Sequence, residues 1–203
     1  MSPCRTAISL ALMLLLWACD SGGKDGAGKN PTQTPRQEKI TLQNWMYHPE
    51  IRKIRKIVEE TKAGVKDGRI TVKRRVFDRY SKQCTHPYPA VKDELGLDKQ
   101  GNVRFLILTT MLTMEVRGTQ EYYYDETGRL RFILLVEGEG DADKDRVYFD
   151  EKGKVLITVG EVDGKFLERE YSKDIAIAAR PLTPQEAERV FLADTSCPEI
   201  KAQ

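Results

Sequence analysis

The chain has 203 residues, with 33 Lys and Arg against 31 Asp and Glu, so its formal net charge at pH 7 is +2. A chain this close to neutral is not built to attract nucleic acid over a broad surface. The only two histidines are His48 and His86, which leaves little material for a histidine-based triad or a zinc site. Phosphate-loop, nucleophile-elbow and His-Glu-x-x-His motifs do not occur, so the sequence predicts no catalytic residue, metal or cofactor.

An apolar run opens the chain, and Arg5 is the only charge before it. The run covers residues 7–18, which is short of the roughly 20 residues that a membrane-spanning helix needs. It has the length of a signal-peptide core. We therefore predict that residues 1–18 are a signal peptide.

The run ends in Leu16-Trp17-Ala18-Cys19, which resembles the lipobox of bacterial lipoproteins although Trp17 replaces the usual small residue. The resemblance implies cleavage before Cys19, a diacylglycerol thioether on Cys19, an acylated amino group such as a palmitoylated one, and a lipid anchor in a membrane. Asp20 directly follows Cys19 and resembles the inner-membrane retention signal of enterobacterial lipoproteins. The choice between inner and outer membrane stays open. The alternative is an ordinary secretory peptide or an uncleaved anchor in which Cys19 is incidental.

A polar stretch follows, with one apolar residue between positions 20 and 39. Such a stretch cannot bury enough surface to offset the entropy of ordering it. We predict a flexible linker over residues 19–39 and a single extracytoplasmic globular domain over residues 40–203. That domain contains Cys84 and Cys197, which we expect to form a disulfide in an oxidising compartment. Two free thiols or a redox pair are the alternatives, and no Cys-x-x-Cys motif supports the redox pair.

The first predicted element of the domain is a helix that opens at His48-Pro49 and ends near Gly64. Its apolar positions recur at helical spacing, and His48 is interpreted as its N-terminal cap. The basic positions between them are Arg52, Lys53, Arg55 and Lys56. They form either the solvated side of a helix packed on a sheet or a flank that contacts anionic lipid headgroups beside the anchor.

From Gly68 onward the apolar period changes to two, which predicts strands. The expected strands cover residues 69–77, 103–111, 120–124, 130–137, 146–149, 155–161 and 165–171. Turns with Asp followed three residues later by Gly recur at Asp98, Asp125 and Asp150, and each predicts a type I turn closing a hairpin. Asp67-Gly68 and Asp163-Gly164 are expected to be tighter two-residue versions of the same turn.

Two of these segments, residues 124–130 and 149–155, resemble the Tyr-Asp hairpin repeats of large bacterial cell-surface proteins. Only these two good copies exist, so the resemblance implies an architecture of successive hairpins and no function.

The chain closes with Thr183-Pro184-Gln185-Glu186, a capping box with Pro at the first helical position. It predicts a short helix that ends near Asp194 and is held against the body by Cys197. The predicted fold class is therefore α+β: an antiparallel β-meander of about six to seven strands with an N-terminal helix and a short C-terminal helix.

Two segments, residues 105–108 and 132–136, are apolar at every position. They predict central strands covered on both faces. Two helices offer limited cover for such a sheet. Either the sheet curls to cover itself, or a partner or an apolar ligand closes a remaining face.

Two local clusters are candidate sites. Tyr122, Tyr124 and Tyr148, together with Tyr123, form either an aromatic platform for sugar rings or ordinary cross-strand pairs. The alternating Asp141, Asp143 and Asp145 resemble a calcium loop, but Arg146 and Lys152 stand where such a loop needs Gly and Glu. A hairpin tip of solvated charges is the alternative.

Three function classes remain open. The first is a non-enzymatic binding lipoprotein of the cell envelope that contacts an envelope protein or a wall component. The second is a structural accessory module of an envelope complex, with its oligomeric state open. The third is a hydrolase acting through carboxylates such as Glu115, Glu121 or Glu137, which a pocket with two facing carboxylates would favour.

Overall fold

The computed structural model describes residues 38–78, 80–82, 84, 90–112, 117–138, 143–169, 180–193 and 197–200. They belong to one unit that runs from Glu38 to Gln203. Its elements, in chain order, are α1 (Pro49–Lys66), β1 (Thr71–Val76), β2 (Ala90–Leu97), β3 (Val103–Met111), β4 (Arg117–Tyr124), β5 (Leu130–Gly138), β6 (Asp143–Phe149), β7 (Val155–Val162), β8 (Lys165–Glu168) and α3 (Pro184–Leu192).

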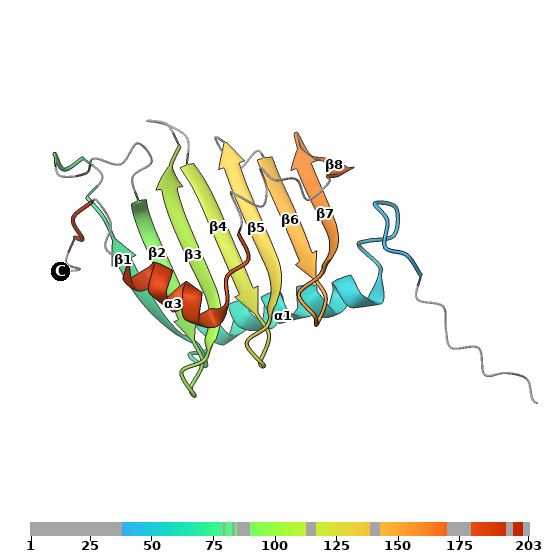
Figure 1. Ribbon diagram of the computed structural model, residues 1–203, viewed down its shortest axis with the longest axis horizontal. Helices are drawn as coiled ribbons and strands as arrows, with labels where there is room; N and C mark the ends of the chain where they lie inside the picture. The colour runs from blue at the N-terminus through green and yellow to red at the C-terminus, as the bar shows by residue number, and fades with distance from the viewer. Residues whose placement is uncertain are drawn as a thin grey trace, which may run out of the picture. The chain divides into compact units, whose positions relative to one another are not determined.

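The eight strands form one antiparallel sheet in which each strand pairs with its neighbours in sequence, from β1 to β8 (Figure 1). The α+β class, the meander and both helices are confirmed. One strand exceeds the seven expected, because β2 lies where no strand was predicted. Within the described part of the chain, β1 and β8 are the two edge strands of this sheet.

Both helix starts follow from local sequence. The Nδ1 of His48 accepts a hydrogen bond from the backbone N–H of Glu50 at 3.3 Å, and Pro49 occupies the first helical position. At the second helix, the Thr183 side chain accepts from the N–H of Glu186, and the Glu186 carboxylate accepts from the N–H of Thr183 at 2.8 Å. These contacts satisfy backbone donors that have no partner within the helix. The predicted caps are therefore confirmed.

The three Asp-to-Gly turns close hairpins as predicted. In each, the Gly N–H donates to the carbonyl of the Asp three residues earlier, at 3.0–3.1 Å. The Asp carboxylate in turn accepts backbone N–H groups of the turn, as Asp125 does from Thr127 and Arg129. The Gly residues have φ between 77° and 86°, which an L side chain adopts only with strain. This is why glycine recurs at these positions.

The two Asp-Gly pairs have different roles, which corrects one prediction. Asp163 and Gly164, with φ of 49° and 73°, form the two-residue turn between β7 and β8. Asp67 and Gly68 instead end α1: the Asp67 N–H donates to the carbonyl of Ala63, and Gly68 adopts φ of 76°. The same dipeptide thus closes a hairpin after a strand and caps a helix after a helical stretch.

Helices α1 and α3 lie on opposite faces of the sheet, with α1 crossing behind the strands and α3 in front of them in Figure 1. The central strands are buried on both faces: Phe105, Leu106, Phe132 and Ile133 are at most 7% exposed. Consecutive residues of these strands contribute to two separate cores. The prediction that these strands are central and covered on both sides is confirmed at these positions.

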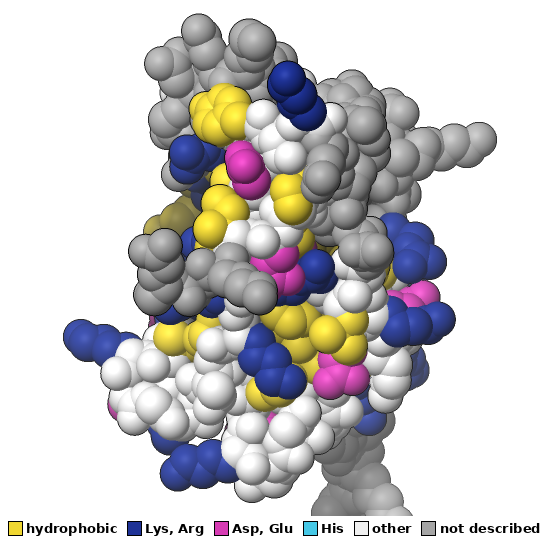
Figure 2. Space-filling view, turned by 90° about the vertical axis from the view of Figure 1, so that its left-hand side faces the viewer, with side chains coloured by type: hydrophobic (Ala, Val, Ile, Leu, Met, Phe, Trp, Pro, Cys, Tyr) yellow, Lys and Arg dark blue, Asp and Glu magenta, His cyan; other side chains and the backbone are white. Residues whose placement is uncertain are grey.

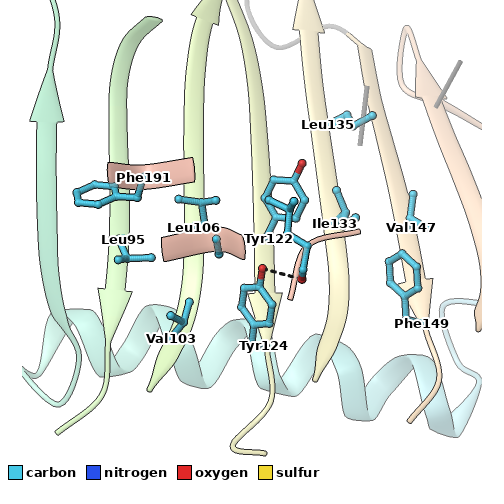
Figure 3. Packing of buried hydrophobic residues seen from close by; sticks show 12 residues of the cluster. Leu95, Val103, Leu106, Tyr122, Tyr124, Ile133, Leu135, Val147, Phe149 and Phe191 are labelled. Atoms are coloured by element: carbon cyan, nitrogen blue, oxygen red, sulfur yellow. Dashed lines mark hydrogen bonds between the residues drawn. The ribbon is translucent and has the colours of Figure 1, made fainter. Parts of the chain in front are cut away.

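The core on the α3 face is largely aliphatic. Side chains from β2 to β6 share the face on which α3 lies, and Phe191 of α3 lies near Leu95 and Leu106 (Figure 3). The hydroxyl of Tyr124 donates to the backbone carbonyl of Leu182 at 3.1 Å, and both residues are buried. This hydrogen bond ties the segment before α3 to the middle of the sheet.

The core on the α1 face contains a row of aromatic rings across four neighbouring strands. Phe105, Tyr123, Phe132 and Tyr148 follow one another with ring centroids 6.3, 6.0 and 4.9 Å apart. On β2, the position next to Phe105 in this row is Gly96, and a Cβ there would lie 2.1 Å from the Phe105 ring. The glycine therefore makes room for the first ring of the row.

The disulfide between Cys84 and Cys197, predicted from the sequence, is present. It holds the C-terminal segment beside β1, where the N–H of Ile200 donates to the carbonyl of Val76 at 2.7 Å. Arg75 also binds this region, through Glu199 and the Phe191 and Ala193 carbonyls at the end of α3.

The β1 edge carries charge along its length. Lys73, Arg74 and Arg75 stand in succession on this strand, and viewed from this side, charged side chains interrupt the hydrophobic areas (Figure 2). Charged edges of this kind oppose pairing with a strand of another molecule.

Candidate functional site

A groove of about 230 Å³ lies between the second half of α1 and strands β1 to β4. It arises because α1 covers the row of aromatic rings but leaves the neighbouring row, which contains Glu94, Ile107 and Glu121, partly accessible. Its lining combines apolar and charged groups: Thr61, Lys62, Val65, Val72, Arg74, Glu94, Phe105, Ile107, Glu121 and Tyr123.

The strand register aligns the charged residues of the groove. Arg74 of β1 pairs with Glu94 of β2, Glu94 with Ile107 of β3, and Ile107 with Glu121 of β4. The two glutamates are therefore separated by two strand spacings, about 10 Å between Cα atoms. Ile107 forms an apolar floor between two carboxylates.

Glu94 is fully compensated by basic neighbours. Its carboxylate accepts from Arg74 Nε at 2.6 Å and forms an ion pair with Lys92 Nζ at 3.1 Å. Burial raises the pKa of Glu94, but the hydrogen bonds and charges of Arg74 and Lys92 outweigh burial and leave this pKa below its usual value. Glu94 is therefore ionised at neutral pH and already neutralised.

Glu121 differs, because its contact is with a neutral donor. The hydroxyl of Tyr123 donates to its Oε2 at 2.6 Å. Burial, followed by the charge and the hydrogen bond of Glu121, raises the pKa of Tyr123 well above its ordinary value, so Tyr123 remains a donor. Within the described part of the chain, no Lys or Arg lies within 4 Å of the Glu121 carboxylate.

Thr61 supplies a second uncompensated group. Its side chain is 1% exposed, it lines the groove, and its Oγ1 has no hydrogen-bond partner among the residues that the structure describes. A buried hydroxyl without a partner costs free energy that a bound donor or acceptor would recover. Lys62 lies beside it, with Nζ 5.8 Å from the centre of the Tyr123 ring.

The groove therefore combines an apolar floor, a carboxylate without a basic partner among the described residues and an unpartnered hydroxyl. Val72, Phe105 and Ile107 suit an apolar body, while Glu121 accepts hydrogen bonds from a cationic or neutral donor. An amphipathic group that carries an ammonium fits this combination best, because the ammonium would neutralise Glu121.

The carboxylates named for a hydrolase do not gather at one place. Glu121 lines the groove, whereas Glu137 lies in β5 opposite Gly118 and Asp143 and is exposed. Glu115 lies outside the described residues. Glu94, which the sequence analysis did not single out, is the second carboxylate of the groove, and its low pKa does not suit a general acid.

The structure does not bring the three candidate tyrosines together as one surface. Tyr122 and Tyr124 belong to the core on the α3 face, and Tyr148 belongs to the core on the α1 face. All three are at most 2% exposed. They are core residues on opposite sides of the sheet, and Tyr123 is the tyrosine that reaches a groove.

The aspartates compared with a calcium loop are placed in part. Asp143 and Asp145 lie in β6, and Asp145 forms an ion pair with Arg169 at 3.3 Å. Asp141 lies outside the described residues, as do His86, Cys19 and the whole of residues 1–37. No group of three or more His, Cys, Asp or Glu side chains suited to a metal ion occurs among the residues described.

A buried acid on the other face was also missed from the sequence. Asp93 of β2 is 5% exposed and lies opposite Arg75 of β1. Burial raises the pKa of Asp93 to about 6, the charge of Arg75 opposes this rise, and the charge of Glu199 adds to it. The sequence offers no usable signal for this buried acid, because Asp93 stands in a stretch whose residue pattern did not predict a strand.

Comparison with known proteins gives no relative. No protein-family model, curated protein or solved structure matches the chain. Within the described part of the chain, neither helix combines the length and the apolar character needed to cross a membrane.

Proposed function

We propose that the chain is a membrane-tethered lipoprotein of the bacterial cell envelope whose folded domain is a non-enzymatic binding module. Its signal peptide would be removed before Cys19, and the acylated Cys19 would hold the domain outside the cytoplasm. The groove between α1 and β1 to β4 would be the binding site. No metal or cofactor takes part in this function.

The apolar run at residues 7–18, the Leu-Trp-Ala-Cys sequence and the polar stretch behind it support the location. The disulfide between Cys84 and Cys197 is compatible with it, because such bonds persist mainly in oxidising compartments. Two or more acyl chains on Cys19 would anchor the domain stably.

The observation that carries the binding function is the pair of uncompensated groups in one groove. Glu121 has no basic partner within 4 Å among the described residues, and the buried Thr61 hydroxyl has no partner. An envelope molecule with an ammonium on an apolar body, such as an amine-bearing part of a protein or wall component, would satisfy Glu121 and cover Ile107.

Site-specific photocrosslinking in native envelopes tests the binding function. A photoreactive side chain at Lys62, on the rim of the groove, should give a discrete adduct. The same side chain at the exposed Lys152, in the turn between β6 and β7, is the matched control and should not. Glu121→Gln should weaken the Lys62 adduct while leaving the fold intact by circular dichroism. Equal adducts at both positions, or none at Lys62, would contradict the proposal.

Mass spectrometry of the native product tests the location separately. The expected product begins at Cys19 and carries acyl mass on that residue, and Cys19→Ser should abolish the acyl mass and release the protein from membranes. An intact Met1, or an unmodified Cys19, would contradict the lipoprotein proposal.

A further inference from the structure

The outward face of α1 carries four basic side chains within two helical turns. Arg52, Lys53, Arg55 and Lys56 are all exposed. They line a shallow hollow of about 670 Å³ together with Met46, Pro49 and Glu59. We name this surface, made by these seven residues, the basic face of α1.

The two arginines of this face are free to bind anions. Lys53 pairs with Glu50 at 2.7 Å, and Lys56 pairs with Glu60 at 3.5 Å. In the described structure no acidic group lies within 4 Å of Arg52 or Arg55. Exposed ion pairs like those of the lysines are weak, so the lysines too can exchange their partners for phosphate groups.

Apolar side chains lie at the N-terminal end of the same helix. Tyr47 is 77% exposed and Met46 is 38% exposed, immediately before His48 and Pro49. An exposed aromatic ring beside basic residues is typical of surfaces that lie at the boundary between lipid headgroups and acyl chains.

The polypeptide leading from Cys19 enters the domain beside this face. Glu38 is fixed at the start of α1 by two contacts: its carbonyl lies 3.1 Å from His48 Nε2, and its carboxylate accepts from Asn44 Nδ2 at 3.2 Å. Residues 20–37 separate Glu38 from Cys19, and a Gly-rich coil of this length reaches roughly 25 Å. An anchor at Cys19 would therefore present the basic face to the bilayer at high effective concentration.

We propose that the basic face of α1 docks on the surface of an anionic lipid bilayer. This inference rests on the proposed membrane tether and deepens it, because it gives the domain an orientation. Arg52, Lys53, Arg55 and Lys56 contact lipid phosphates, and Tyr47 inserts at the headgroup boundary. The groove between α1 and β1 to β4 then lies along a helix that rests on the membrane, within reach of molecules at its surface.

Amine footprinting of the full chain tests this orientation. The chain is reconstituted in phosphatidylcholine vesicles with or without phosphatidylglycerol, labelled with an amine-reactive reagent and analysed by mass spectrometry. Anionic vesicles should lower the labelling of Lys53 and Lys56 by about threefold, and raised salt should restore it. Lys165, the first residue of β8, is exposed and serves as the internal control. Equal labelling of Lys53 and Lys56 in the two kinds of vesicle would overturn the proposal.

Charge variants sharpen the test. Arg52→Gln with Arg55→Gln should abolish the protection of Lys53 and Lys56. Arg69→Gln with Arg129→Gln removes the same charge from exposed positions elsewhere and should leave the protection unchanged. Loss of protection in both double variants would show a nonspecific charge effect and overturn the assignment to this face.

The footprint and the lipidation are independent measurements. The chain can be added to vesicles whether or not Cys19 is acylated, so protection of Lys53 is measured independently of lipidation. An unmodified Cys19 with a positive footprint would refute the lipoprotein alone. An acylated Cys19 without a footprint would refute the docking alone.

Discussion

The two faces of the sheet are built from the same eight strands but are closed in different ways. On the α3 face, aliphatic side chains meet Phe191, Tyr124 binds the Leu182 carbonyl, and the C-terminal segment is joined to the body by a disulfide (Figure 3). On the α1 face, an 18-residue helix covers a row of aromatic rings and leaves a groove with uncompensated polar groups beside them.

The two faces differ in what is accessible beside their polar groups. On the α3 face, Tyr124 and Arg75 are bound within the chain, whereas the buried hydroxyl of Thr158 on the same face has no hydrogen-bond partner among the described residues. On the α1 face, Glu121 has no basic partner and Thr61 has no hydrogen-bond partner in the described structure, and both line a groove. A groove with such groups gains by binding a ligand, because the ligand can supply the missing partners.

The largest expected effect on stability comes from removing the disulfide that joins the C-terminal segment after α3 to the rest of the domain. Replacing both cysteines, Cys84→Ser and Cys197→Ser, should lower the free energy of unfolding by about 4 kcal/mol, because the bond closes a loop with a sequence separation of 113. Urea denaturation of oxidised wild type and variant measures the difference. A loss below about 1 kcal/mol would mean that the bond does not constrain the unfolded chain.

A matched pair of tyrosine variants compares the faces directly. Tyr124→Phe should cost about 1.5 kcal/mol, because it leaves the buried Leu182 carbonyl without its donor. Tyr123→Phe should cost about 0.5 kcal/mol, since the partly buried Glu121 can bind water instead. It should, however, change the crosslinking at Lys62, whereas Tyr124→Phe should not. The reverse order of the two stability losses would contradict our assignment of roles to the faces.

The buried acid Asp93 makes a pH-dependent contribution. Its folded pKa of about 6 lies above the ordinary value of 3.8, so the fold favours the protonated form. Its contribution is full below about pH 4 and is lost as the pH rises through 6, because the native state must then ionise a buried carboxyl. Asp93→Asn should therefore raise the unfolding free energy by about 1 kcal/mol at pH 7.5 and by little at pH 4. Thermal unfolding at both pH values measures this, and an equal effect at both would argue against titration of Asp93.

The smallest effect is expected in the groove. Thr61→Val replaces an unpartnered hydroxyl by a methyl group of similar size, so the unfolding free energy should rise or stay within about 0.5 kcal/mol. The same change should weaken the Lys62 crosslink. Chemical denaturation together with the crosslinking assay separates the two roles. A stability loss above 1 kcal/mol would show that the hydroxyl is already bonded in the native domain.

The sequence by itself determined the helix starts, the turns and most of the strands of the domain. His48-Pro49 and Thr183-Pro184 fixed the helix starts, Asp-to-Gly spacings fixed three hairpins, and period-two apolar positions identified seven strands. These features depend on contacts within a few residues, so neighbouring sequence is sufficient to specify them.

Only the tertiary structure decided the features that depend on contacts between residues distant in sequence. β2 contains Lys92, Asp93 and Glu94 in succession, and it is a strand because β1 and β3 pair with it and Arg74 neutralises Glu94. The faces of Tyr122 and Tyr124 and the meeting of Thr61 with Glu121 follow from register and from where α1 crosses the sheet. Burial and electrostatic compensation are properties of the assembled fold, since both require neighbours that are distant in sequence.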